Sequence, residues 1–231
     1  MTQDELKKLV AKAAVQEILN LLPEHSLLGM GTGSTVNFLI DELKEYANYF
    51  SGVVSSSDAT SQRLLSNGFK VLDANTVQSL PLYIDGADEI DPDGNMLKGG
   101  GGALTREKIV ASLASQFICI CDATKLVPVL GQFPLPVEVI PMASAQIQRV
   151  LESLGGQVRI RNSKVDPNLP FVTDNQGWIL DVKGLAIENP LALETKLNQI
   201  PGVICNGIFA IQSANMLLVS AIDQVQKTIF K

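Results

Sequence analysis

The stretch PLYIDGADEIDPDGNMLKGGGGALTREKIVASLASQFICICD, residues 81–122, decides the fold of this chain. It begins with an apolar segment that runs into acidic residues, and it closes with the apolar run FICIC (117–121). Between them, four consecutive glycines precede a segment with helical spacing at 104–116. Strands that are apolar on both faces and joined by a helix are typical of a parallel sheet covered by helices.

The same alternation of helix and strand extends toward the N-terminus. Thr2 and Glu5 have the spacing of a capping box, which predicts where the first helix begins. The expected helices and strands follow one another along the chain: helix 3–21, strand 26–31, helix 36–48, strand 52–58 and helix 61–68. The sequence therefore predicts an α/β domain built on a parallel sheet.

From Gly131 onward the pattern changes. Strands and helices are expected in the order β-α-β-β-α-β: 136–140, 142–156, 157–161, a hairpin around 175–177, 189–200 and 202–210. This order predicts a small α+β (ferredoxin-like) domain over residues 131–210 for a lid or for oligomerisation. The apolar tail is expected to return to the first sheet, so residues 1–130 and 211–231 would form the catalytic domain.

Composition narrows the classes of partner. Eighteen basic and 24 acidic residues give a net charge of −6, which disfavours nucleic-acid binding because that depends on neutralising phosphates. No apolar run reaches the roughly 18 residues that a membrane span needs, and the N-terminus lacks the pattern of a signal peptide. We therefore expect a cytoplasmic protein without a nucleic-acid or membrane partner.

The residues that commonly bind metals are few. Cys119, Cys121 and Cys205 lie in apolar settings and are expected to be reduced core thiols, and the single histidine, His25, is expected in a turn. We see no group of ligands with the spacing of a zinc or iron site, so no metal is expected.

Polar residues follow four of the predicted strands. In an open parallel sheet, ligands bind beyond the carboxyl ends of the strands, so these exits are expected to outline a site. The four exits are GMGTGST (29–35), SSSDATS (55–61), DGADEID (85–91) and DATK (122–125).

The exit GMGTGST favours phosphate binding. Its glycines let the backbone approach an oxyanion closely, and the helix that follows offers N–H groups and partial positive charge. The hydroxyl groups of Thr32, Ser34 and Thr35 add donors. The dinucleotide fingerprint G-x-G-x-x-G fails at Ser34, and the loop lacks the lysine of an ATP site. A tight turn with a serine cap is the alternative.

The third exit and the glycine run carry the groups for proton transfer. Asp85 and Asp88 are three apart and suit that chemistry, although a solvated acidic turn is the alternative. Four glycines in a row gain a fold little unless the backbone must pass close to something, and here Lys98 precedes them. Lys98 can compensate a developing oxyanion, and Glu107 lies in the first turn of the next helix.

These motifs together resemble a known family. GMGTGST, SSSDATS, DGADEID, KGGGGALTREKI and FPLPVEVIP are similar, in order and spacing, to the type A ribose-5-phosphate isomerases. The resemblance implies a Rossmann-like domain with an inserted α+β domain, a homodimer, and no metal or other cofactor. It also implies an aldose-ketose isomerase that interconverts D-ribose 5-phosphate and D-ribulose 5-phosphate in the non-oxidative pentose phosphate pathway.

The resemblance also implies roles for individual residues. Glu107 is the expected base that moves a proton between C1 and C2 through a cis-enediolate, with Lys98 and Asp85 as the other catalytic groups. The residues expected to line the substrate are Thr32, Gly33, Ser34, Thr35, Asp85, Gly86, Ala87, Asp88, Lys98, Gly99, Gly100, Gly101, Lys125 and Lys7. The segment RIRNSKVDPNLPF (159–171) departs from the family pattern because it is longer than in the shorter bacterial members.

Two alternatives remain at this point. One is another enzyme on a related scaffold, such as an amino-sugar phosphate isomerase/deaminase or a coenzyme A transferase. A deaminase would be expected to use a histidine, and His25 lies outside the motif loops. The other is a sugar-phosphate sensing domain without turnover, which would usually carry a DNA-binding module that the sequence does not show.

Overall fold

The computed structural model describes residues 1–222 and 224–230, and its internal contacts divide the chain into two compact units. Unit 1 consists of Met1–Ala87, Arg106–Leu126 and Ala214–Lys231. Unit 2 consists of Asp88–Thr105 and Val127–Ser213. Within the described ranges, no helix combines the length and the apolar character that crossing a membrane requires.

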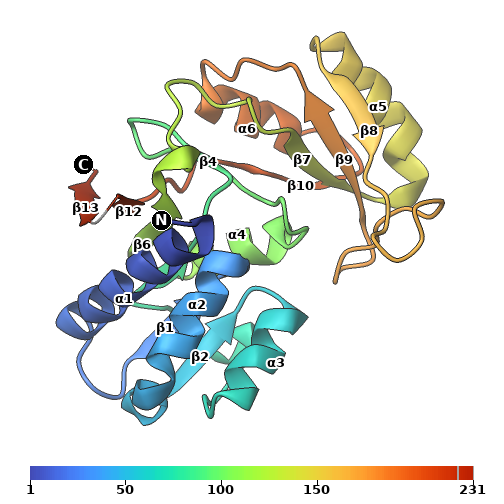
Figure 1. Ribbon diagram of the computed structural model, residues 1–231. Helices are drawn as coiled ribbons and strands as arrows, with labels where there is room; N and C mark the ends of the chain where they lie inside the picture. Colours follow the sequence, from blue (N-terminus) through green and yellow to red (C-terminus); the bar gives the residue numbers. More distant parts are fainter. Residues whose placement is uncertain (223, 231) are drawn as a thin grey trace. The chain divides into compact units, whose positions relative to one another are not determined.

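Unit 1 is built on a six-stranded sheet (Figure 1). Its strands are β1 (Leu27–Met30), β2 (Gly52–Ser55), β3 (Tyr83–Asp85), β6 (Phe117–Asp122), β12 (Met216–Ala221) and β13 (Gln224–Ile229). They lie in the order β13-β12-β6-β3-β1-β2, and every neighbouring pair is parallel except β12 and β13. The expected parallel sheet and the return of the C-terminal tail to it are confirmed.

Several helices of unit 1 begin at a residue whose side chain caps them, whereas the helix that begins after Gly33 has no side-chain cap. They are α1 (Gln3–Leu21), α2 (Ser34–Leu43), η1 (Lys44–Tyr49), α3 (Asp58–Ser66), η2 (Ala74–Thr76), α4 (Leu104–Ser112, which starts in unit 2) and η3 (Ala123–Lys125). The capping box at Thr2 and Glu5 is present, and Ser57 caps α3 by accepting the N–H of Thr60. His25 lies in the turn after α1, as expected.

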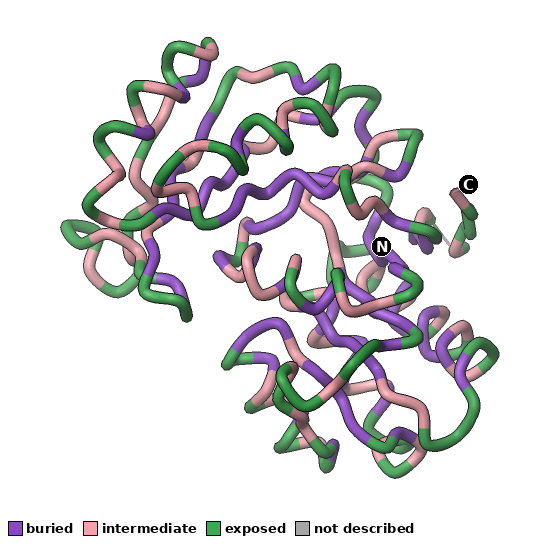
Figure 2. The backbone as a smooth tube through the Cα atoms, turned by 180° about the vertical axis from the view of Figure 1, so that it is seen from behind, coloured by how far each residue is buried: buried purple, intermediate pink, exposed green. Residues whose placement is uncertain are grey.

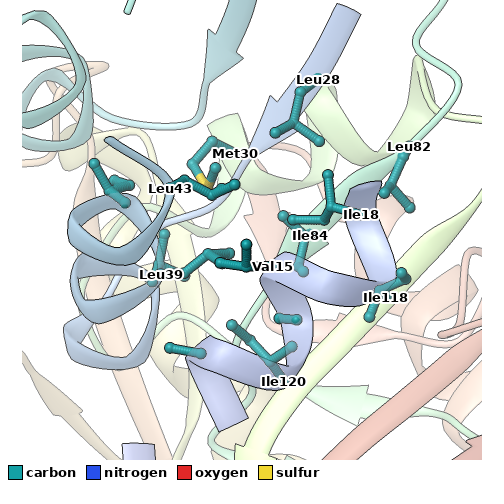
Figure 3. Close-up of a cluster of buried hydrophobic side chains, with 14 of the residues drawn as sticks. Val15, Ile18, Leu28, Met30, Leu39, Leu43, Leu82, Ile84, Ile118 and Ile120 are labelled. Atoms are coloured by element: carbon teal, nitrogen blue, oxygen red, sulfur yellow. The ribbon is translucent and has the colours of Figure 1, made fainter. Parts of the chain in front are cut away.

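The core of unit 1 lies between the sheet and the helices α1 and α2. Figure 3 shows Val15 and Ile18 of α1 packed toward strand residues such as Ile84 and Ile118, which are all buried. Each such side chain contributes roughly 1.5–3 kcal/mol when it leaves water. Strand β6 is buried along its whole length, and Figure 2 colours the buried, intermediate and exposed stretches along the backbone.

The strand order creates a switch point between β1 and β3. The chain passes from β1 to β2 on one side and then returns past β1 to place β3 on its other side. Connections therefore leave β1 and β3 in opposite directions, and this is where open α/β sheets bind ligands. The loops after these two strands are GMGTGST (29–35) and DGADEID (85–91).

Unit 2 contains a four-stranded antiparallel sheet with two helices on one face. In chain order its elements are β7 (Leu135–Val139), η4 (Pro141–Ala143), α5 (Ser144–Ser153), β8 (Gln157–Ile160), β9 (Trp178–Lys183), α6 (Pro190–Asn198) and β10 (Val203–Asn206). The sheet order is β10-β7-β9-β8, and side chains of α5 and α6 pack on β7 and β9. This is the expected β-α-β-β-α-β arrangement.

A second, three-stranded sheet in unit 2 shifts the expected domain bounds. Strands β4 (Glu89–Ile90), β5 (Met96–Leu97) and β11 (Ile208–Phe209) pair in the order β11-β5-β4. The sequence places the division at residues 130 and 211, whereas the contacts group residues 88–105 with the inserted unit. The reason is that β4 and β5 hydrogen-bond with β11 and do not join the parallel sheet.

Two expected strands of unit 2 also differ from the structure. The strand expected at 202–210 is divided at Gly207, whose N–H donates to the carbonyl of Pro136 while its own carbonyl accepts the N–H of Lys98. The first arm of the expected hairpin makes only an isolated bridge, between Val172 and Trp178. Strand β9 pairs instead with β7 and β8.

Candidate active site

In unit 1, the loop after β1 is fixed by Asp85 at the end of β3. The N–H of Gly31 donates to the carbonyl of Ile84 at 2.9 Å, and the N–H of Thr32 donates to Asp85 Oδ1 at 3.1 Å. A Cβ atom at position 31 would lie 1.9 Å from Asp85 Cγ, so only glycine fits. Asp85 is fully buried and also accepts the N–H of Gly86 at 2.7 Å. It therefore holds the two switch-point loops together.

A cluster of hydroxyl groups holds the same loop from the side of β2. Thr32 Oγ1 lies 2.8 Å from Ser56 Oγ, 2.9 Å from Ser57 Oγ and 3.3 Å from Thr60 Oγ1. Thr60 Oγ1 in turn donates to the carbonyl of Gly31 at 3.0 Å. The Thr32 hydroxyl, expected to face the substrate, is therefore engaged in positioning the loop.

The N-terminus of α2 is the part of this loop that faces solvent. Gly33 and Ser34 are exposed, and Gly33 stands at the N-cap with a φ of 132° and no side chain to cap the helix. The first N–H groups of a helix lack partners within the helix and carry partial positive charge. Together with the hydroxyls of Ser34 and Thr35, they suit an oxyanion such as a phosphate.

Tyr83 and Glu107 complete a buried polar cluster beside Asp85. The hydroxyl of Tyr83 donates to Asp85 Oδ2 at 2.5 Å, and Glu107 in the first turn of α4 is only 3% exposed. The pKa of Tyr83 lies well above its ordinary value of 10.0. Burial disfavours the phenolate most, and the negative charges of Asp85 and Glu107 add to this effect. The expected base thus shares an environment with Asp85.

The two other lysines expected near the substrate lie in unit 1. Lys125 ends η3, directly after β6, so it stands at the carboxyl end of a central strand. Lys7 lies in the second turn of α1, and its Nζ atom is 3.4 Å from Asp4 Oδ1. The side chain of Lys7 is 14% exposed.

In unit 2, Lys98 and the glycines that follow it form one compact loop. The Lys98 N–H donates to the carbonyl of Gly207 at 2.9 Å, and its Nζ atom lies 5.5 Å from the centre of the Phe209 ring. Lys98 is only 2% exposed, so water screens charge poorly around its side chain. A turn closes the loop, because the N–H of Gly102 donates to the carbonyl of Gly99 at 2.9 Å.

Asp88 and Arg161 bind the glycine run from two sides. Asp88 Oδ2 accepts the N–H of Gly100 at 2.7 Å. Arg161 Nη1 donates to the carbonyl oxygens of Gly99 and Gly100 at 3.0 and 3.1 Å. The run is therefore not a flexible linker, since Asp88 binds one of its N–H groups and Arg161 binds two of its carbonyls.

A further buried carboxylate of unit 2 holds the start of α4. Glu138 on β7 is fully buried and accepts hydrogen bonds from the hydroxyls of Thr105 and Thr173 and, at 3.3 Å, from the Asn175 side chain. Thr105 is the second residue of α4, so Glu138 holds the part of this helix that belongs to unit 2. Leaving one of these buried partners unsatisfied costs about 1–3 kcal/mol.

The structure thus separates the expected site residues into two groups. In unit 1 it brings together Thr32, Asp85, Gly86 and Glu107; in unit 2 it brings together Asp88, Lys98, Gly99 and Gly100. Residue-by-residue reasoning missed Tyr83, Arg161 and Glu138. Tyr83 could have been found, because it precedes Asp85 by two positions and shares its face of the strand. Arg161 and Glu138 could not, because their contacts depend on how β7, β8 and β9 pair in unit 2.

Comparison with known proteins gives the same family that the sequence motifs resemble. Residues 52–224 match the model of the family described as ribose 5-phosphate isomerase A (phosphoriboisomerase A). The chain is 60% identical over 227 residues to ribose-5-phosphate isomerase A of Polynucleobacter asymbioticus, covering 95% of this chain and 96% of that protein. It is 56% identical to the protein of the same name from Polynucleobacter necessarius subsp. necessarius, with both chains fully covered.

Solved structures give the same result. The crystal structure of ribose 5 phosphate isomerase A from Neisseria gonorrhoeae superposes with a TM-score of 0.92 at 40% identity, covering 99% of this chain and 97% of that chain. A D-ribose-5-phosphate isomerase in complex with phospho-erythronic acid superposes with a TM-score of 0.91 at 36% identity, covering 99% and 100%. The likeness therefore extends over both units of the chain.

Proposed function

Since the chain belongs to the ribose 5-phosphate isomerase A family, we propose how its own residues interconvert D-ribose 5-phosphate and D-ribulose 5-phosphate in the pentose phosphate pathway. The overall reaction is supported by membership of this family. The observation that carries the mechanism is the buried carboxylate of Glu107, which shares the surroundings of Tyr83 with Asp85.

The phosphate is bound by the N-terminus of α2. Ser34 and Thr35 supply hydroxyl and backbone donors at an exposed helix end, and Lys7 and Lys125 supply positive charge in an otherwise acidic chain. Binding energy from this unreactive end of the sugar phosphate holds the open-chain aldose with C1 and C2 beside the base.

Glu107 transfers the proton. As a carboxylate it takes the C2 proton of the aldose, and the electron pair of that C–H bond moves into a C1–C2 double bond while the carbonyl oxygen becomes an oxyanion. The protonated Glu107 then returns its proton to C1, and the C2 oxygen becomes the ketone. One base serves both carbons because they are adjacent on one face of a planar cis-enediolate.

Charge on the enediolate is stabilised by Lys98 and by backbone N–H groups of the glycine run. Lys98 is nearly fully buried, so its charge is weakly screened. Of the two aspartates, Asp85 is fully buried and already accepts the hydrogen bonds that fix the loop after β1. Asp88 also accepts a hydrogen bond, from the Gly100 N–H, but it is only half-buried, so we assign the transfer of a hydroxyl proton between O1 and O2 to this more accessible carboxylate.

We further propose that the protein acts in the cytoplasm as a homodimer. The support is the usual state of the family together with the reduced, buried cysteines Cys119, Cys121 and Cys205, which suit a reducing compartment. Sedimentation equilibrium of the purified chain measures its oligomeric state.

The deciding experiment is an isomerase assay on the EDTA-treated protein. Ribose 5-phosphate is supplied, and formation of the ketose is followed for the wild type, for Glu107→Gln and for Glu45→Gln, a matched control at an exposed position. We expect kcat to fall about 10²–10⁴-fold in Glu107→Gln, because the amide keeps the shape and loses the basicity. The control should equal the wild type.

Each result of this assay has a defined meaning. Near-normal turnover by Glu107→Gln would remove the base assignment while leaving the reaction in place. An inactive wild type that still binds ribose 5-phosphate would favour a sensing domain, and recovery of activity only after adding a divalent cation would contradict a metal-independent mechanism.

A further inference from the structure

The side chain of Arg161 makes four hydrogen bonds, two to Asp181 and two to carbonyls of the glycine run. Arg161 follows β8 directly, and its Nε and Nη2 atoms donate to the two carboxylate oxygens of Asp181 on β9 at 2.9 and 2.5 Å. Its Nη1 atom donates to the carbonyl oxygens of Gly99 and Gly100 at 3.0 and 3.1 Å. The side chains of Arg161 and Asp181 are only 15% and 25% exposed.

The backbone of Arg161 is held as firmly as its side chain. Its N–H donates to the carbonyl of Ile179 at 2.8 Å, and its carbonyl accepts the N–H of Phe171 at 2.7 Å. The planar guanidinium is thus fixed from the strand side and from the carboxylate side, so its third nitrogen points at the glycine run in a single orientation. This is more than an isolated ion pair requires.

The peptide group between Gly100 and Gly101 transmits this orientation. In a trans peptide the carbonyl and the N–H point in opposite directions, so a cation bound to the Gly100 carbonyl fixes where the Gly101 N–H points. The positive charge also polarises the peptide, which makes that N–H a stronger donor. Gly100 donates to Asp88, and Gly102 donates to Gly99.

The N–H of Gly101 differs from these two neighbours. Across residues 1–222 and 224–230, no acceptor is found for it, and residue 101 is exposed. A Cβ atom built at this position would meet no atom within 4 Å. The structure therefore presents one oriented, polarised donor to open space, directly after the peptides that Arg161 and Asp88 hold.

We propose that Arg161, held by Asp181, is a positioning residue that aims the Gly101 N–H at the oxyanion of the enediolate. This inference rests on the proposed function, since it needs a reaction in which an oxyanion develops. It assigns a role in the reaction to the residue that directly follows β8. Donors aimed in advance at developing charge are effective because they need no reorganisation during the reaction.

The test compares three variants with the wild type. Arg161→Met removes the guanidinium, and Arg161→Lys keeps the charge without the fork that reaches Asp181 and both carbonyls together. Arg159→Met removes an exposed arginine two residues away and serves as the control. For each protein we would measure kcat and KM for ribose 5-phosphate and the inhibition constant of phospho-erythronic acid, whose carboxylate stands in for the enediolate oxygens.

The expected pattern is specific to positioning. In Arg161→Met, kcat should fall about ten- to hundredfold, KM should change less than about threefold, and phospho-erythronic acid should bind more weakly by a factor similar to that for kcat. Arg161→Lys should recover only part of the loss, and Arg159→Met should match the wild type. A purely structural role would lower thermal stability and leave kcat per folded molecule and the inhibition constant unchanged.

If folded Arg161→Met has the kcat and the inhibition constant of the wild type, the inference is wrong. The proposed function is unaffected by that result as long as the wild type is active. A wild type without isomerase activity would overturn the proposed function itself. If Arg161→Met fails to fold, Asp181→Asn takes its place, because it keeps the size of the side chain and loosens the guanidinium. We expect it to lower kcat about three- to tenfold, and wild-type kcat in that variant would reject the inference.

Discussion

The loop of residues 31–35 and the glycine run of residues 98–102 are both rich in glycine, yet their neighbours hold them differently. In the first loop, a buried carboxylate and a cluster of hydroxyl groups surround the backbone so closely that a Cβ at Gly31 would overlap Asp85. In the second, a carboxylate binds an N–H, a guanidinium binds two carbonyls, and Gly101 faces open space.

This difference shows that a glycine-rich segment can serve two purposes. Where neighbours close around the backbone, glycine is required by packing, and the useful donors lie further on, at the exposed start of α2. Where neighbours leave the backbone open, glycine lets a ligand approach a peptide N–H directly. The first arrangement suits the phosphate, which does not react, and the second suits the carbons that do.

The largest effects on kinetics should come from changing one charge in each loop, by removing the positive charge of Lys98 and by adding a negative charge at Ser34. Lys98→Met should lower kcat about 10²–10³-fold with little change in KM, because it removes a charge that acts on the transition state. Ser34→Asp places a negative charge at the phosphate end and should raise KM with kcat nearly unchanged. Steady-state kinetics with ribose 5-phosphate measures both. If Lys98→Met changed KM alone, the assignment of Lys98 to the reacting end would be wrong.

An intermediate effect is expected on stability, where an alanine should be tolerated at Gly101 and not at Gly31. Gly31→Ala forces a Cβ into Asp85 and should lower the free energy of unfolding by about 1–3 kcal/mol, which for a chain of this size shifts Tm by several degrees. Gly101→Ala meets no atom within 4 Å and should leave Tm within about 2 °C of the wild type. Thermal unfolding measures both, and equal shifts in the two variants would contradict the distinction.

The smallest effect concerns Tyr83, which supports the first loop through Asp85. Its pKa in the folded chain lies above the ordinary value of 10.0, so the unfolded chain releases this proton first. The free energy of unfolding should therefore fall as the pH rises above about 10, by at most about 1.4 kcal/mol per pH unit for one proton. Tyr83→Phe should remove that part of the slope.

Urea unfolding between about pH 9 and 11 measures this slope. Tyr46→Phe, at an exposed position, controls for losing a phenol elsewhere in the chain. A slope in Tyr83→Phe equal to that of the wild type would mean that the folded and unfolded chains release the Tyr83 proton at the same pH.

The sequence predicted the layers of the fold because hydrophobic periodicity and capping are local. The capping box at Thr2, the apolar run FICIC and the change of pattern after Gly131 each report a local environment that the structure confirms. The bounds of the inserted unit were not predicted, since β4 and β5 are two residues long and their partner β11 lies far along the chain.

The positions of the candidate site loops after the strands were predictable to the same extent, while the roles of their residues stay predictions. Motifs that follow strands could be assigned to one edge of a sheet by topology alone. The supporting residues could not, because Arg161 and Glu138 act through partners that only the pairing of β7, β8 and β9 brings close. At Thr32 the residue type alone was misleading. A threonine in this loop suggests a ligand contact, but in the structure its hydroxyl hydrogen-bonds with neighbouring hydroxyl groups that hold the loop.

The place of β12 has a consequence for how the chain is made. This strand lies between β6 and β13 inside the sheet of unit 1, and Phe117 bonds to Asn215, 98 residues later. During synthesis, the edge of β6 that will pair with β12 therefore stays unpaired while residues 127–213 of unit 2 emerge from the ribosome. Unpaired edges favour aggregation. A chain released before β12 is complete is thus the form of this protein most in need of a chaperone.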